Sequence, residues 1–102
     1  MNDYDKRQLT LILKKIGFFR ESDHSLTELS SLTNDIPALI NVMEAIEEPW
    51  KEECRSWWWD LEEIYAVALD RDKSALDEND KQIVFKAVDE IENMVKKKMM
   101  KS

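Results

Sequence analysis

The residue types that most often carry out catalysis are scarce in this sequence. His24 is the only histidine and Cys54 the only cysteine among 102 residues. His24 lies in a polar stretch, where an exposed loop histidine is favoured over a general base. Cys54 lies on an apolar helical stripe, where a small buried hydrophobic residue is favoured over a reactive thiol, because reactivity requires exposure and positive neighbours. A single cysteine can form neither an intrachain disulfide nor a thiolate zinc site.

Pairs of adjacent acidic residues are the other potential source of chemistry, because carboxylates can bind metal ions or transfer protons. Such pairs include Glu47-Glu48, Glu52-Glu53, Glu62-Glu63 and Asp89-Glu90. Helical di-iron sites combine acids with a Glu-x-x-His pattern on each of two helices, which one histidine cannot supply. Adjacent helical residues point about 100° apart, so these pairs are typical of a solvated surface. We therefore expect no catalytic residues, no metal and no cofactor, and we predict that the protein is not an enzyme.

Net charge limits the kinds of partner that this protein can bind. The formal net charge is −7 and the pI is near 4.7. Acids strongly outnumber bases between Glu44 and Glu92, whereas the last ten residues are basic. The acidic region repels nucleic-acid phosphates and attracts basic protein surfaces. We expect no direct nucleic-acid binding. Two alternatives stay open for the charge, namely solubility alone and an acidic mimic that occupies a nucleic-acid-binding protein.

Three consecutive tryptophans, Trp57, Trp58 and Trp59, interrupt a regular helical pattern. The apolar residues of this pattern recur every three or four positions and share one helix face; they are Trp50, Cys54, Trp57, Trp58, Leu61, Ile64, Tyr65 and Ala68. One helix face cannot hold all three tryptophans. Trp59 lies about 200° around the helix from Trp57 and is expected to point away from the core.

The neighbours of Trp59 at helical spacing are mostly acidic, which suggests a surface for recognition. Tryptophan is enriched in binding hot spots, and acids around it would steer a basic partner. We predict a partner-binding surface made of Trp59, Glu52, Glu62, Glu63 and Asp70. In one alternative, Trp59 packs under a loop such as residues 18–20. In another, it stacks against its mate in a homodimer with opposed like charges.

Helices must position these residues, because turn formers are rare: the chain has one glycine and two prolines. We predict an all-α fold, a compact antiparallel bundle of four main helices plus one short helix, in a single domain of residues 1–102. The expected helices are about Asp3 to Ile16 with Gly17 as terminator, a short one from the capping box Ser25-Leu26-Thr27-Glu28 to Leu32, Asn34 to near Glu48, Pro49 to about Asp70, and Asp77 to Val95. The basic tail of residues 96–102 is expected to fray.

Membrane and export signals are not evident in the sequence. The longest interval without charge, residues 36–43, is too short to cross a bilayer. The N-terminus lacks the basic flank and apolar run of a signal peptide. We expect a cytoplasmic protein with no membrane contact, either a monomer or a weak dimer.

The stretch from Trp57 through Trp58 and Trp59 to Asp70, together with the helix of residues 77–95, resembles a known group of proteins. In character it is similar to the immunity proteins encoded beside bacterial toxins of contact-dependent inhibition and polymorphic-toxin systems. The resemblance covers less than half of the chain and transfers no site residue. It implies a cytoplasmic inhibitor that binds a cognate toxin domain, often a basic nuclease, and blocks its active site or substrate surface. A non-catalytic regulatory or scaffold subunit would use the same surface and remains the alternative.

Overall fold

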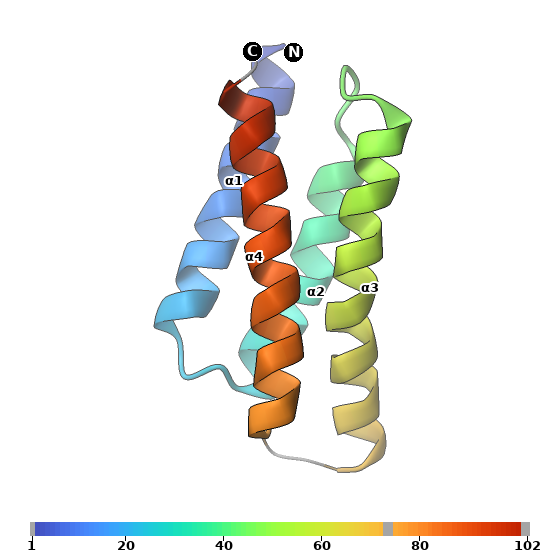
Figure 1. Ribbon diagram of the computed structural model, residues 1–102. Coiled ribbons are helices and arrows are strands. Elements are labelled where there is room, and N and C mark those ends of the chain that lie inside the picture. The colour runs from blue at the N-terminus through green and yellow to red at the C-terminus, as the bar shows by residue number, and fades with distance from the viewer. Residues whose placement is uncertain (1, 73–74, 101–102) are drawn as a thin grey trace.

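Helices account for most of the chain in a computed structural model that describes residues 2–72 and 75–100 (Figure 1). The four helices of this part are α1 (Asp3–Glu21), α2 (Leu26–Asn41), α3 (Glu48–Asp70) and α4 (Glu78–Met100). The only β-type pairing among these residues is one isolated bridge between Ser25 and Ala75. The predicted all-α class is confirmed. No described helix is long and apolar enough to span a membrane.

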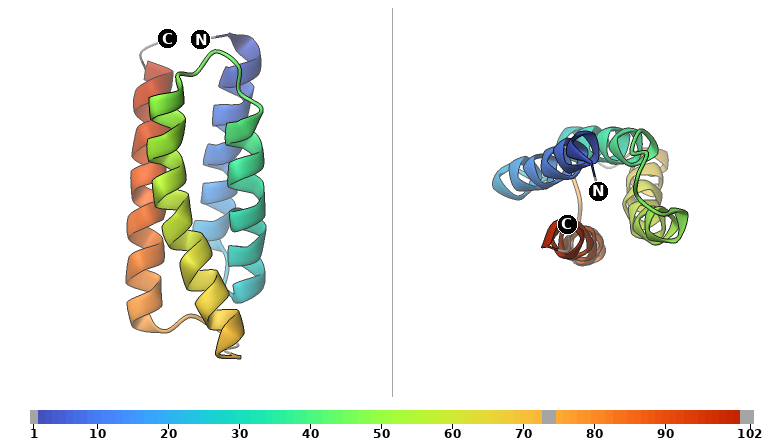
Figure 2. Two further views of the ribbon diagram at one scale, coloured as in Figure 1. Left: turned by 90° about the vertical axis from the view of Figure 1, so that its right-hand side faces the viewer. Right: turned by 90° about the horizontal axis from the view of Figure 1, so that it is seen from above.

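The helices surround one core in the order in which they follow one another in the chain. Consecutive helices pack side by side and run in opposite directions, and α4 returns to α1 (Figures 1 and 2). Within the described residues, α1 does not contact α3, and α2 does not contact α4. The outer surfaces of α1 and α3 therefore lie on opposite sides of the core.

Each helix contributes one apolar stripe to the core, as the 3.6-residue period predicts. The fully or nearly fully buried residues include Leu9, Ile12, Ile16 and Phe19 of α1, Leu29, Leu32, Ile36 and Ile40 of α2, Cys54 and Leu61 of α3, and Val84, Ala87, Val88, Ile91 and Val95 of α4. Trp50, Trp57 and Trp58 are partly buried and pack against this core, as expected. The core therefore occupies one side of every helix and leaves the other side available.

Helix α1 does not end at Gly17, as the sequence predicted, but continues to Glu21. Phe19 supplies the reason, because this extra turn places its side chain in the core. Burial of a phenylalanine stabilises a fold by about 1.5–3 kcal/mol, whereas glycine inside a helix costs about 1 kcal/mol relative to alanine. Core packing therefore outweighs the local preference of Gly17.

Helix α2 replaces two predicted segments, the short helix ending at Leu32 and the helix expected to begin at Asn34. The Ser25 cap is present, since its side-chain oxygen accepts the Glu28 N–H at 3.3 Å. The chain then stays helical through Pro37 and ends at Asn41, well before Glu48. No separate fifth helix is present among the described residues.

The loop of residues 42–47 is held by two buried charged side chains that the periodic pattern did not identify. The Asp5 carboxylate accepts the N–H of Glu44 at 3.0 Å and the N–H of Ala45 at 2.7 Å. The Lys51 ammonium donates to the Met43 carbonyl. Asp5 is fully buried and Lys51 is nearly so. The loop thus joins the first turn of α1 to the start of α3.

The predicted basic tail is largely helical, because α4 continues through residues 96–100. Residues 101–102 lie outside the described part of the chain. Lys98 donates to both carboxylate oxygens of Glu47, at 2.5 and 2.7 Å. This ion pair ties the end of α4 to the residue that precedes α3, so the basic segment makes a tertiary contact that its composition did not indicate.

Candidate protein-binding face

Helix α3 divides its tryptophans between the core and solvent. Cys54, Leu61 and Ala68 are fully buried on its inner side. Trp59 lies on the opposite side and is 60% exposed. The alternative in which Trp59 packs under residues 18–20 is therefore wrong, and the angular argument from the sequence is correct for this residue.

Trp58 supports Trp59 through a bond that originates in α2. Pro37 has no N–H, so the carbonyl of Thr33 lacks its usual helical donor four residues on. The indole N–H of Trp58 donates to this carbonyl at 2.8 Å. The Trp58 and Trp59 ring centroids lie 4.9 Å apart. A proline in one helix thus anchors the indole on which the exposed Trp59 rests.

We define the α3 outer face as the five residues predicted to bind a partner: Glu52, Trp59, Glu62, Glu63 and Asp70. Glu52, Glu63 and Asp70 are exposed, and Glu62 is half-buried. Glu62 and Glu63 follow Trp59 by about one helical turn. At about 1.5 Å per residue, Asp70 lies roughly 16 Å further along the axis and is not a neighbour of Trp59.

Arg55 divides the acids of this face into paired and unpaired groups, and the sequence prediction did not include it. Its guanidinium lies 2.7 Å from the Glu52 carboxylate and 3.6 Å from that of Glu48. It also donates to the side-chain oxygen of Asn41 at 2.8 Å. The spacing of Glu48, Glu52 and Arg55 along one helix side could have indicated this pairing. Glu52 is therefore partly neutralised.

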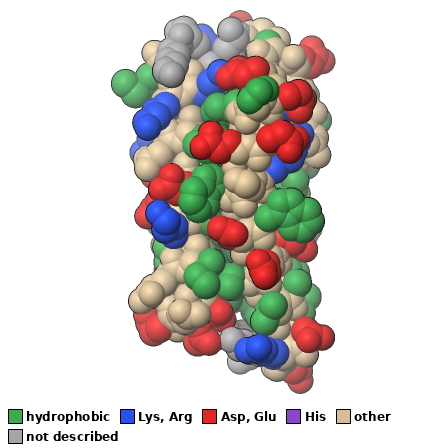
Figure 3. Space-filling view, turned by 45° about the vertical axis from the view of Figure 1, so that its right-hand side comes forward, with side chains coloured by type: hydrophobic (Ala, Val, Ile, Leu, Met, Phe, Trp, Pro, Cys, Tyr) green, Lys and Arg blue, Asp and Glu red, His purple; other side chains and the backbone are tan. Residues whose placement is uncertain are grey.

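The unpaired negative charge lies on the C-terminal side of Trp59. Within the described residues, no ion pair involves Glu62, Glu63 or Asp70. Figure 3 shows the same character more broadly, with acidic side chains around separate hydrophobic patches over α3 and α4. Leu69, which the site prediction omitted, adds a side chain that is 54% exposed. The face combines one large aromatic group with uncompensated carboxylates.

The groups that could perform catalysis have structural roles instead. His24 is half-buried and not an exposed loop residue as predicted. Its ring packs 4.9 Å from that of Phe85 and 5.3 Å from that of Phe19, and its Nε2 lies 3.0 Å from the Arg20 carbonyl oxygen. Among the described residues, no group of three or more His, Cys, Asp or Glu could hold a metal ion.

Cys54 is expected to be unreactive in the native protein. Burial raises the pKa of its thiol to about 12. At pH 8 the native thiolate fraction should be roughly 1000-fold below that of the unfolded chain, and alkylation should slow in proportion. Iodoacetamide labelling followed by mass spectrometry, in buffer and in urea, measures this ratio. Equal labelling rates in the two conditions would contradict it.

The same pKa shift has a consequence for stability at high pH. An unfolded thiol ionises near pH 9, whereas the folded one stays protonated until about pH 12. The stabilising contribution of Cys54 is therefore complete below pH 9 and decreases as the pH rises towards 12, by up to about 1.4 kcal/mol per pH unit. Urea unfolding of the wild type and of Cys54→Ala should show a stability difference that changes over this range only.

No protein-family model, no curated protein and no solved structure matches this chain in comparisons with known proteins. Relatives therefore give no guide to the site. The functional argument depends on the geometry of the α3 outer face and on its charges.

Proposed function

We propose that this protein is an immunity protein that binds a cognate, basic toxin domain through the α3 outer face and thereby neutralises it. The observation that carries the proposal is the exposed indole of Trp59, which is held against Trp58 beside unpaired carboxylates. Tryptophan side chains in such positions often dominate binding energy. A side chain already held in place also loses less entropy on binding.

The support beneath this face favours a binding role over a purely structural one. Trp58 is fixed by its bond to Thr33, and Arg55 ties α3 to Asn41 at the end of α2. We infer an antiparallel four-helix bundle, which would hold α3 rigid along its length. A rigid helix face of this kind is suited to a preformed groove or flat surface on a partner.

The charge of the face favours a basic partner. Glu62 and Glu63 lie about one turn from Trp59 and have no cationic partner in the described chain. Such carboxylates increase the rate of encounter with a basic surface and oppose binding to an acidic one. A nuclease toxin has a basic substrate surface, so an acidic face could occupy it in place of nucleic acid. We also propose the cytoplasm as the site of action, where such a toxin would act.

The proposal can be tested by co-expression with the product of the adjacent reading frame. If that product is the toxin, its expression alone should arrest growth, and co-expression of this chain should restore growth. The two purified proteins should form a 1:1 complex by isothermal titration calorimetry. Absence of both protection and binding would reject the proposed function.

Charge reversal at Glu62 and Glu63 should slow association. We expect Glu62→Lys combined with Glu63→Lys to lower the association rate constant by about ten-fold or more at low salt, and to have little effect once salt screens the charges. Stopped-flow fluorescence at several salt concentrations measures this. The control is Glu21→Lys with Glu44→Lys, which changes net charge equally away from the face. Equal slowing by both pairs would show that only net charge matters.

A further inference from the structure

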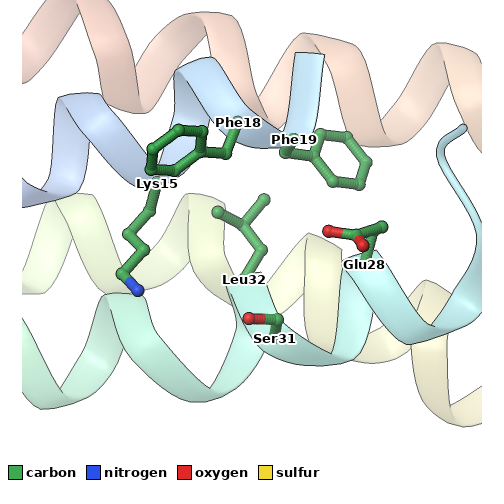
Figure 4. A pocket seen from close by; sticks show the side chains of 6 residues that line it. All are labelled: Lys15, Phe18, Phe19, Glu28, Ser31 and Leu32. Carbon is green, nitrogen blue, oxygen red and sulfur yellow. The ribbon is translucent and has the colours of Figure 1, made fainter. Parts of the chain in front are cut away.

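A groove between α1 and α2 has the size and lining to accept an aromatic side chain. Its volume is about 240 Å³, and it is lined by Lys15, Phe18, Phe19, Glu28, Ser31 and Leu32. In Figure 4, Phe18 and Phe19 project from α1 and Leu32 extends towards them from α2. An apolar cavity of roughly 150 Å³ is large enough to bind benzene. An indole ring therefore fits the space of this groove.

The helix that forms one wall of the groove has an exposed surface that is both apolar and basic. Tyr4, Leu11 and Phe18 are 42%, 37% and 66% exposed and share one side of α1, since they are seven residues apart. Arg7 and Lys14 alternate with them on this side. We call these five residues the α1 outer face. Large apolar side chains repeated along one outer helix side are typical of a contact surface.

The cations of α1 are largely unpaired. Within the described residues, Lys6, Arg7 and Lys14 take part in no ion pair. Lys15 lies 3.2 Å from the Asp35 carboxylate of α2. Figure 4 places Lys15 at the Phe18 end of the groove and Glu28 at the Phe19 end. Positive charge therefore gathers at the Phe18 end, in a protein whose net charge is −7.

The molecule thus carries two complementary surfaces, an acidic one with a projecting indole and a basic one beside a groove. They lie on different helices that are not in contact, with the core between them. We propose that Trp59 of one copy inserts into the α1–α2 groove of a second copy. Its neighbours Glu62 and Glu63 would then face the cations at the Phe18 end. A symmetric stack of Trp59 on Trp59 would instead oppose like charges.

This head-to-tail contact joins two different surfaces and leaves one of each free at the ends of the pair. Such contacts either close into rings or extend into chains. The inference goes beyond the proposed function and does not rest on it. The two share only the Trp59 surface, so a bound toxin would compete with self-association.

Sedimentation velocity of the full chain tests this inference. The weight-average sedimentation coefficient of the wild type should rise with concentration up to several hundred micromolar, and the rise should weaken at high salt. Trp59→Ala, which lacks the indole, and Ser31→Glu, which places a carboxylate in the groove, should each stay monomeric. Both positions are exposed, so thermal melting should show an intact fold in each variant.

Mixing the two variants separates this contact from other modes of association. Trp59→Ala retains the groove and Ser31→Glu retains the indole, so an equimolar mixture should form a 1:1 heterodimer that cannot extend. A monomeric wild type, self-association of either variant, or a mixture without heterodimer would each overturn the inference. Ser31→Glu should still bind a toxin with wild-type affinity, so failure of this contact is distinguishable from failure of the proposed function.

Discussion

Substitution of Trp59 by alanine is expected to weaken toxin binding by roughly 30- to 1000-fold, which corresponds to the 2–4 kcal/mol typical of a hot-spot tryptophan. Stability should change little, because Trp59 is 60% exposed and contributes little to the core. Isothermal titration calorimetry with the purified toxin domain measures the affinity, and thermal melting measures the stability. The expected signature is a large loss of affinity at a nearly constant melting temperature.

Two further variants on α3 serve as controls for this experiment. Leu69→Ala removes a side chain that is 54% exposed and lies away from Trp59, so the affinity should change by less than about five-fold. Trp58→Ala removes the donor to the Thr33 carbonyl and should lower stability as well as affinity. If Trp59→Ala unfolds the protein while binding per folded molecule is unchanged, Trp59 belongs to the core and the interface lies elsewhere.

Substitution of Asp5 by alanine is expected to destabilise the fold far more than substitution of an exposed acid. The Asp5 carboxylate accepts two backbone N–H groups of the loop before α3, at 3.0 and 2.7 Å, in a fully buried position. Hydrogen bonds to charged groups contribute about 1.5–3 kcal/mol each, so the loss should be roughly 3–5 kcal/mol. For a domain of this size the melting temperature should fall by more than about 10 °C. Urea unfolding and calorimetry provide the measurements.

Asp3→Ala is the matched control, since Asp3 is an exposed acid in the same first turn of α1. It should cost no more than about 1 kcal/mol, the size of a helix-dipole effect. Asp5→Asn retains one acceptor oxygen and should lie between the two alanine variants. Similar losses in Asp3→Ala and Asp5→Ala would mean that the carboxylate does not hold the loop.

Periodicity in the sequence was sufficient for the class of the fold and for the side of α3 on which each tryptophan lies. The angle between successive helical residues separates Trp59 from Trp57 and Trp58, and it holds in any tertiary context. Element boundaries were less predictable. Gly17 and Pro37 are weak helix formers in isolation, yet both lie within helices whose apolar stripes continue past them. Local propensity is a small energy that core burial readily exceeds.

Contacts between helices could be found only in the tertiary structure. The bond from Trp58 to Thr33 joins residues 25 positions apart, and those from Asp5 reach residues 39 and 40 positions away. Which of the predicted acids are neutralised also depends in part on the nearness of Asn41 to Arg55.

The pattern of residue types thus determined that the protein is helical and that an indole faces outward among acids, because both follow from geometry within one helix. The packed structure decided which helices are neighbours. That choice determines which carbonyl holds Trp58, which carboxylates keep their charge, and where a basic groove lies. These features depend on distances between segments far apart in the chain, which a helical period does not contain.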